Sequence, residues 1–240
     1  MKNKDNTVNI MANSKILLIP DASSRTDPPI KHKPETKRKA EAKPKPEIKK
    51  NYHHGDLRAA LLEAGFKLLE DRKGEALGLR EVARAVGVSP TAIYRHFPDK
   101  SALMLALAHE GLERLGNAQL KASQKAVDPR AALVAGGVTY VRFASENPAL
   151  FRLIFSYVPP ISPLDASLDE VGLAMRGLRE GIHATMPNHF SESEKRVATL
   201  LAWSLVHGLA ELMLNGHISK DWKMIERVVS SLAVTPHMHP

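Results

Sequence analysis

Residues 79–100 read LREVARAVGVSPTAIYRHFPDK, and this stretch decides the fold. Apolar residues recur at helical spacing on both sides of Gly87, which predicts two short helices joined by a turn. Gly87 stands where a helix ends in the left-handed conformation that glycine adopts most readily. Ser89 can cap the second helix, and Pro90 suits its first position. This is the pattern of a helix-turn-helix, whose second helix enters the major groove of DNA.

The second helix of this motif is expected to carry apolar residues on one side and polar residues on the other. Ile93 and Phe97 form an i,i+4 pair that can dock this helix on the first one. Pro98 is expected to end the helix, and Asp99 can cap the helix that follows. The residues left facing outward, or at the rim, are Thr91, Tyr94, Arg95 and His96.

The outward residues carry groups that suit two kinds of DNA contact. Tyr94 and His96 can donate hydrogen bonds to phosphate oxygens, and Lys100 lies beside the free N–H groups of a helix start. The residues that can meet guanine edges, other base edges or thymine methyl groups are Arg95, Thr91 and Ala92. Any all-α protein can expose a Tyr and an Arg at a helical corner. The complete set of cap, turn, Pro, Tyr and Lys argues against that alternative better than any single residue does.

The wider sequence resembles the DNA-binding domain of the TetR family of transcriptional regulators. The similarity runs over residues 51–115 and includes a helix of about four turns, the helix-turn-helix and an aromatic pair of the type Y-x-x-F. Here the pair is Tyr94 and Phe97, followed by the basic residue Lys100. The later segment WSLVHGLAEL, residues 203–212, is similar to a subgroup whose C-terminal domain carries a Trp…His-Gly signature.

One position departs from the family pattern. Gly78 stands where relatives often carry a Ser or Thr that caps the first helix of the motif, so a side-chain phosphate contact is lost there. Arg80 can replace that contact. The predicted DNA-contacting residues are therefore Arg80, Ser89, Pro90, Thr91, Ala92, Tyr94, Arg95, His96 and Lys100.

The resemblance implies an all-α protein of about nine helices. An N-terminal three-helix DNA-binding domain, residues 51–115 with its recognition motif at about 78–97, precedes a helical effector-binding and dimerisation domain at 116–240. Apolar periodicity and caps place the remaining helices as follows. They are expected at 56–72, 100–124, 128–147, 149–157, 164–185, 191–216 and 222–233, and Ser191 with Glu194 forms a capping box.

The helix at 191–216 is apolar over more than one face, so both sides must be buried. A two-fold dimer is the simplest way to bury the outer side, and it would place two recognition helices about 34 Å apart on a palindromic site. The interface residues predicted on this helix are Leu205, Leu209, Leu212 and Met213. The predicted pocket for an unknown small-molecule effector comprises Phe143, Phe151, Phe155, Met175, Trp203 and His207. Alternatively these six are ordinary core residues.

The charge is concentrated at the N-terminus. Residues 1–50 hold 13 of the 34 Lys and Arg residues but only 6 of the 26 Asp and Glu residues, so the tail supplies +7 of the net +8. Its Lys- and Pro-rich part predicts a disordered arm. The arm can be an electrostatic tether on DNA or only a solubilising tail, and Met11 is an alternative start. A non-specific DNA-architectural protein led by this arm is the alternative function.

Other functional classes find little support. The chain has no Cys, which excludes disulfides and Cys-based metal sites, and none of the common hydrolase, P-loop or dinucleotide motifs occurs. His237 and His239 lack a third metal ligand nearby. No apolar run approaches the ~20 residues that span a membrane. We therefore expect a cytoplasmic protein that is not an enzyme, has no cofactor or metal and does not contact a membrane.

Overall fold

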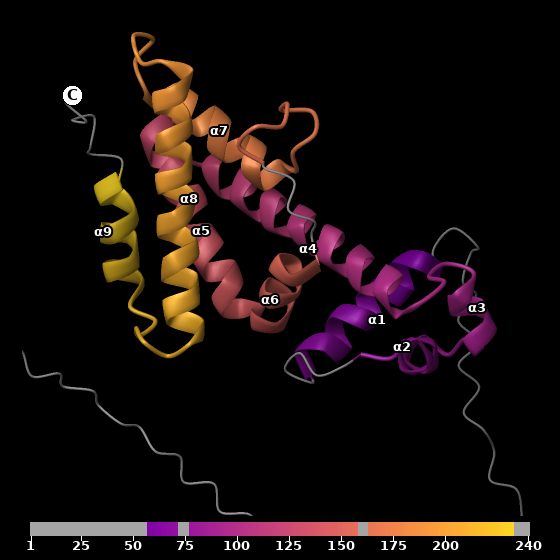
Figure 1. Ribbon diagram of the computed structural model, residues 1–240. Coiled ribbons are helices and arrows are strands. Elements are labelled where there is room, and N and C mark those ends of the chain that lie inside the picture. Colours follow the sequence, from indigo (N-terminus) through magenta and orange to yellow (C-terminus); the bar gives the residue numbers. More distant parts are fainter. Residues whose placement is uncertain (1–56, 72–76, 158–162, 233–240) are drawn as a thin grey trace, which may run out of the picture. The chain divides into compact units, whose positions relative to one another are not determined.

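The structure is a computed structural model that describes residues 57–71, 77–157 and 163–232. Contacts divide the chain into residues 1–47, all outside the described part, and 48–240, which contains every described helix. Within the described ranges all regular structure is helical, which confirms the all-α prediction (Figure 1). The helices are α1 (Leu57–Asp71), α2 (Leu79–Val86), α3 (Pro90–Tyr94), α4 (Lys100–Ser123), α5 (Pro129–Glu146), α6 (Pro148–Tyr157), α7 (Leu173–Thr185), α8 (Glu192–Leu214) and α9 (Trp222–Leu232).

The first three helices close around the beginning of α4. Their shared core contains Leu61, Val82, Ile93 and Leu107, each fully buried, and Phe97, which is 2% exposed. These residues come from α1, α2, α3, the turn after α3, and α4, so each element contributes to a single core. The three-helix unit predicted from residues 79–100 and the preceding helix is therefore present.

Helix α4 is the long element that joins this unit to the rest of the chain. It packs on α1 and also on α5, α6 and α7. At the crossing with α7, a Cβ atom at Gly116 would lie 2.7 Å from the backbone nitrogen of Ala174. The two helices can approach this closely only because residue 116 has no side chain. The predicted boundary at residues 115 and 116 falls inside this single helix.

The C-terminal helices build a second apolar core around α5. Tyr140 and Val141 of α5, Ala210 of α8 and Ile225 of α9 are at most 4% exposed. Helix α5 packs against α4, α6, α7, α8 and α9, which makes it the central element of this region. The predicted helices at 128–147, 149–157, 191–216 and 222–233 agree with α5, α6, α8 and α9.

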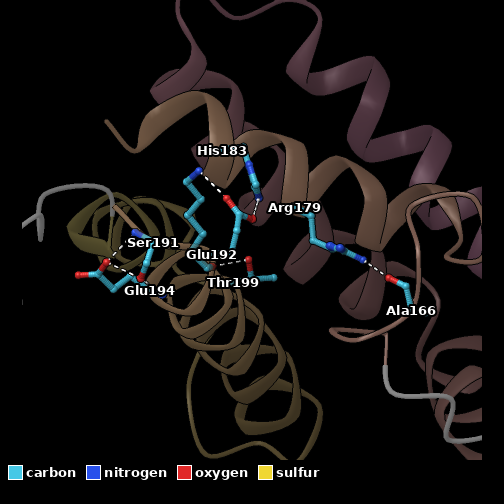
Figure 2. Close-up of polar contacts among 8 residues, drawn as sticks. Ala166, Arg179, His183, Ser191, Glu192, Glu194 and Thr199 are labelled. Carbon is cyan, nitrogen blue, oxygen red and sulfur yellow. Dashed lines mark hydrogen bonds and ion pairs between the residues drawn. The ribbon is translucent and has the colours of Figure 1, made fainter. Parts of the chain in front are cut away.

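The predicted helix at 164–185 is wrong in its first half, because α7 begins only at Leu173. Residues 163–172 form turns and bends instead, and two arginines of α7 donate to backbone carbonyls of this segment. Arg179 donates to the Ala166 carbonyl at 2.7 Å (Figure 2). Arg176 donates to the Leu168 carbonyl at 3.1 Å. Apolar spacing alone did not predict the late start of α7. The hydrogen bonds that replace those of a helix come from arginines that lie later in the chain.

Helix α8 begins at the predicted capping box. Ser191 accepts from the Glu194 backbone N–H at 3.3 Å, and Glu194 accepts from the Ser191 backbone N–H at 2.7 Å (Figure 2). The Ser191 hydroxyl also donates to the Glu194 carboxylate at 2.6 Å, and this bond together with that from the Ser191 N–H holds the pKa of the carboxyl group below its ordinary value. Beside them, Glu192 accepts from Lys195 at 2.8 Å and lies 3.4 Å from His183 of α7. The start of α8 is thus fixed by its own residues and by α7.

The apolar composition of helix α8 bears on the expectation about membranes. By length and composition it is apolar enough to cross one, with a mean hydropathy of 1.6 over an 18-residue window. The mean hydropathy of a window can stay high when the window contains a single charged residue such as Glu211. An unbroken apolar run, in contrast, contains no charged residue. One such helix is weak evidence for a membrane span, but only 22% of that window is buried in the single chain. This leaves much apolar surface on α8 uncovered.

Candidate nucleic-acid interface and effector domain

The turn between α2 and α3 has the predicted geometry. Gly87 has φ 82° and ψ 25°, in the left-handed region, and its N–H donates to the Arg84 carbonyl at 3.1 Å. The Val88 N–H donates to the Ala83 carbonyl at 2.9 Å, so two carbonyls at the end of α2 are satisfied. The turn at residues 87–89 therefore ends α2 and leads directly into α3, which packs against α2.

Helix α3 is shorter than expected. It ends at Tyr94, and the N–H groups of His96 and Phe97 both donate to the Ile93 carbonyl, at 3.0 and 2.9 Å. Arg95 and His96 therefore lie in a turn rather than in the helix. The buried pair Ile93 and Phe97 anchors both ends of this segment, as predicted.

Ser89 does not cap α3 through its side chain. Its backbone is extended, with φ −66° and ψ 151°, as at a cap, but the hydroxyl makes no cap hydrogen bond. Pro90 occupies the first turn, where its missing N–H costs nothing. The Ser89 hydroxyl is therefore available to another partner.

Most of the predicted DNA-contacting residues lie on the surface. Tyr94 is 46% exposed, although tyrosine is large and usually half-buried. Ala92 and His96 are half-buried. The exposed residues of the predicted set are Arg80, Ser89, Pro90, Thr91, Tyr94, Arg95 and Lys100.

The start of α4 adds a capped helix end beside this surface. The Asp99 carboxylate accepts from the Ala102 N–H at 2.8 Å, as predicted, and Lys100 is exposed in the first turn. Sequence reasoning missed one basic residue here: the guanidinium carbon of Arg58, on α1, lies 5.5 Å from the centre of the Phe97 ring. The two residues are 39 positions apart, so no local pattern could indicate that they meet.

Polar contacts tie α1 to α4 and α6. Glu70 of α1 accepts from the backbone N–H of Leu150, in the first turn of α6, at 3.0 Å. Arg114 of α4 forms an ion pair with Glu63 of α1, and its guanidinium carbon lies 3.9 Å from the centre of the Phe66 ring. These contacts physically link the DNA-binding helices to the helices that follow.

Four of the six predicted pocket residues come together in the C-terminal domain, around a tyrosine that was not predicted. The His207 ring lies 4.6 Å from Phe155 and 5.6 Å from Phe151, and its Nδ1 lies 2.9 Å from the Tyr140 hydroxyl. Trp203 lies near the same hydroxyl. We call Tyr140, Phe151, Phe155, Trp203 and His207 the aromatic cluster.

The other two predicted pocket residues are not part of this cluster. Phe143 is buried in the core and Met175 lies half-buried on α7. In the described part of the chain, no ring contact or hydrogen bond joins either side chain to the cluster. The i,i+4 spacing of Trp203 and His207 could indicate a shared face, but their partner on α5 could not be identified from local spacing.

Burial and nearby charge set the protonation of the cluster. Burial lowers the pKa of His207, and the carboxylate of Glu211, one turn away on α8, opposes this effect. Burial also raises the pKa of the Tyr140 hydroxyl well above its ordinary value. At neutral pH the cluster therefore contains a neutral imidazole and a neutral phenol.

The predicted dimer residues on α8 divide into two groups. Leu209 and Met213 are 9% and 7% exposed and pack into the core of the protomer, so they cannot form an outer surface. Leu205 is half-buried and Leu212 is 44% exposed. The large apolar residues that α8 leaves exposed are Val197, Leu200, Leu201 and Leu212. The prediction was therefore wrong for Leu209 and Met213, because the face that packs on α5 and α9 was mistaken for the outer one.

Several predictions fall outside the described residues. They concern the basic tail and the expectation that His237 and His239 do not form a metal site. In the ranges that are described, no group of three or more His, Asp and Glu side chains could hold a metal ion.

Comparison with protein families places the chain. Residues 61–107 match the model described as "Bacterial regulatory proteins, tetR family". Residues 133–232 match the model described as "Tetracyclin repressor-like, C-terminal domain". The protein belongs to the TetR family of transcriptional regulators, and its helix-turn-helix is the DNA-binding part. The family and the curated relatives are regulators of transcription rather than enzymes.

Individual relatives agree with this assignment. An uncharacterized HTH-type transcriptional regulator of Mycobacterium tuberculosis (strain ATCC 25618 / H37Rv) is 31% identical over 115 residues, which are 48% of this chain and 57% of the relative. The chain thus spans little more than half the length of the curated relatives it matches. The solved structure of a protein with unknown function from Rhodococcus sp. RHA1 is 31% identical, with a TM-score of 0.59, and the match covers 78% of this chain and 96% of that one.

Two more distant structures share the fold. A TetR family transcription regulator from Marinobacter aquaeolei VT8 is 21% identical with a TM-score of 0.54, over 75% of this chain and 95% of that one. A TetR variant from Acinetobacter baumannii AYE, solved in complex with minocycline, is 18% identical with a TM-score of 0.53, over 73% of this chain and 93% of that one. These two similarities support the architecture of α1 to α9.

Proposed function

We propose that this protein is a ligand-responsive repressor that binds a palindromic operator as a homodimer. The observation that carries the proposal is that one chain has two exposed surfaces of different kinds. The first consists of hydrogen-bond donors on α3 and the turn after it, and the second is the uncovered apolar face of α8. The first surface suits a groove of DNA, and the second suits another copy of the chain. A dimer would double each set of DNA contacts across a two-fold axis.

The donor surface supports sequence-specific binding. Tyr94, His96 and Lys100 would contact phosphates and position the helix, whereas Thr91, Ala92 and Arg95 would meet base edges. Ser89 fits this proposal because its hydroxyl makes no cap hydrogen bond. Arg80 and Pro90 are also exposed and would add contacts to the DNA backbone.

The apolar face of α8 supports the dimer. Leu200, Leu201 and Leu212 are each between 44% and 49% exposed, although they belong to a helix of high mean hydropathy. Contact with the same helix of a second copy would remove this surface from water and stabilise the pair by roughly 25 cal/mol per Å² buried. Leu205 lies half-buried beside them and would join the interface. This proposal replaces the predicted set that included Leu209 and Met213.

The aromatic cluster supports a small-molecule effector. It combines apolar rings with one polar imidazole, as ligand sites commonly do. The A. baumannii relative of the same fold was solved with minocycline, which makes a bound small molecule plausible for this domain. Release from DNA would follow if the ligand binds the DNA-free protein more tightly than the DNA-bound protein. The coupling free energy would be about 1–3 kcal/mol. Glu70 and Arg114 supply physical links along which this coupling can act.

The basic tail would add sequence-independent affinity, and the protein would act in the cytoplasm, where operator DNA is found. The alternative, an architectural protein led by the tail, is less well supported because it leaves the exposed residues of α3 without a role. Truncation of residues 1–50 distinguishes the two. A tether predicts a smaller salt slope of binding with the sequence preference unchanged, whereas an architectural protein would lose most of its DNA binding.

The proposal can be tested by selecting the duplexes that the full chain binds from a random-sequence library. A repressor of this kind should enrich a palindrome, and altering one half-site base pair should weaken binding by ~1–3 kcal/mol. Arg95→Ala should relax the preference at one position in each half-site, and Tyr94→Ala should weaken binding to all sequences. Enrichment without a palindrome would contradict the dimer, and the absence of any enrichment would contradict specific recognition.

A further inference from the structure

The Tyr140 and His207 side chains form a polar contact within the aromatic cluster, and Trp203 lies near it. Trp203 and His207 are four residues apart on α8 and therefore lie on the same side of the helix. His207 reaches the Tyr140 hydroxyl of α5 through Nδ1 at 2.9 Å, and Trp203 lies near the same hydroxyl.

The contact between Tyr140 and His207 determines which nitrogen of His207 carries its hydrogen. Tyr140 is 4% exposed, and within the described residues its O–H has no acceptor other than His207 Nδ1. A buried hydroxyl without an acceptor is costly, so Tyr140 donates to Nδ1. The neutral imidazole must then carry its hydrogen on Nε2.

The Nε2–H group is a donor without a partner. No side chain or backbone group in the described ranges accepts from it, and His207 is only half-buried. Phe155 is the neighbouring ring, 4.6 Å away at an interplanar angle of 63°, and it is 39% exposed although it is large and apolar. A polar donor and an apolar ring are therefore available side by side on α8 and α6. The deeper ring, Phe151, is fully buried and holds Phe155 from below at 4.9 Å.

The charge near this donor limits the classes of ligand that can bind there. Glu211 lies one helical turn after His207 and interacts electrostatically with both His207 and Tyr140. An anion bound at Nε2–H would be repelled by this carboxylate. A cation could not accept the hydrogen bond, because ammonium groups only donate. An uncharged acceptor satisfies both conditions.

We propose that the aromatic cluster binds an uncharged, apolar molecule carrying a carbonyl-type acceptor, such as a ketone, lactone or quinone. The ligand would cover Phe155 and accept a hydrogen bond from Nε2–H of His207. The inference deepens the proposed effector response by naming the ligand class, and so it rests on that function. It also assigns Tyr140 as a positioning residue that holds the imidazole in the donating tautomer.

The test measures calorimetric binding of four naphthalene probes to the full-length protein without DNA. 2-Acetylnaphthalene offers a neutral carbonyl, 2-isopropylnaphthalene has the same shape without an acceptor, 2-naphthoate is anionic, and 2-naphthylmethylammonium is cationic. The ketone should bind about tenfold more tightly than the isopropyl compound, which corresponds to one hydrogen bond. It should also bind more tightly than either charged probe. Equal binding of the ketone and the isopropyl compound, or tighter binding of a charged probe, would overturn the proposal.

Variants show whether His207 is responsible. His207→Phe keeps an apolar ring and should abolish the tenfold preference for the ketone. His207→Gln places an amide N–H near the position of Nε2 and should restore most of it. Tyr140→Phe leaves the imidazole hydrogen free to move to Nδ1 and should reduce the preference only in part. A preference that survives in His207→Phe would overturn the assignment, and far-ultraviolet circular dichroism verifies that each variant is folded.

The outcome is separable from that of the proposed function. Operator selection with ligand-free protein tests DNA recognition without involving the aromatic cluster, and His207→Phe should select the same palindrome as the unaltered chain. If the palindrome is found but no probe prefers the carbonyl, the ligand class is wrong and the DNA-binding regulator remains. If no palindrome is found but the ketone preference holds, the site binds carbonyl ligands and the proposed operator is wrong.

Discussion

The helix-turn-helix and the C-terminal domain are built from apolar helices of similar character, yet they use them differently. In the first region, α1, α2 and α3 turn their large apolar residues into one core and expose mainly polar residues and Tyr94. In the second region, α8 buries Leu209 and Met213 but leaves Leu200, Leu201 and Leu212 uncovered. The first region buries most of its large apolar residues within one chain, whereas the second leaves apolar residues of α8 exposed.

The largest expected effect distinguishes the two faces of α8. Leu209→Asp would place a charge in the protomer core and should destabilise the fold by roughly 5 kcal/mol, enough to unfold many domains. Leu212→Asp, on the exposed face, should leave the protomer folded and dissociate the dimer. Urea unfolding and sedimentation of both variants provide the measurement. A folded, dimeric Leu212→Asp variant would show that the interface lies elsewhere.

The next effect distinguishes the two faces of the α3 segment. Phe97→Ala removes a ring that is 2% exposed and should reduce stability by about 3–5 kcal/mol. Tyr94→Phe removes only an exposed hydroxyl and should change stability by less than about 0.5 kcal/mol. It should nevertheless weaken DNA binding, since the phosphate contact is lost. Thermal unfolding together with operator titration separates these effects, and unchanged DNA affinity in Tyr94→Phe would remove this hydroxyl from the interface.

A third pair of variants tests the contacts that join the two regions. Glu70→Ala leaves the Leu150 N–H without its acceptor in a buried place, and should reduce stability by about 1–3 kcal/mol. Glu63→Ala removes an exposed ion pair with Arg114 and should cost less than about 1 kcal/mol. Hydrogen exchange of the α6 amides should accelerate in the first variant only. Equal exchange in both variants would mean that Glu70 does not hold α6.

The smallest effects concern the two glycines at the ends of α2. Gly87→Ala forces a side chain into the left-handed conformation at φ 82° and should destabilise by about 1 kcal/mol. Gly78→Ser, where the backbone is extended and no side-chain cap exists, should stabilise by a few tenths of a kcal/mol. Chemical denaturation of both variants measures the difference. A neutral Gly87→Ala variant would contradict the left-handed turn.

The sequence could predict a feature when the residues that form it lie close together along the chain. Gly87, Pro90, Asp99 and the Ser191–Glu194 box act within four residues, so their roles could be predicted and were found. The missed features join distant residues: Arg58 with Phe97, Glu70 with Leu150, and Tyr140 with His207. The late start of α7 has the same cause, because Arg176 and Arg179 stabilise turns that precede them.

The amino-acid sequence by itself determined the helical class and the turn of the helix-turn-helix, because local backbone preferences and apolar periodicity specify them. Only the tertiary structure decided which side of α8 is inside, which residues surround His207 and where α1 contacts α6. An amphipathic pattern shows that a face must be buried but not what buries it. When a helix is apolar nearly all round, its inner and outer faces are distinguished only by the neighbours that pack against it.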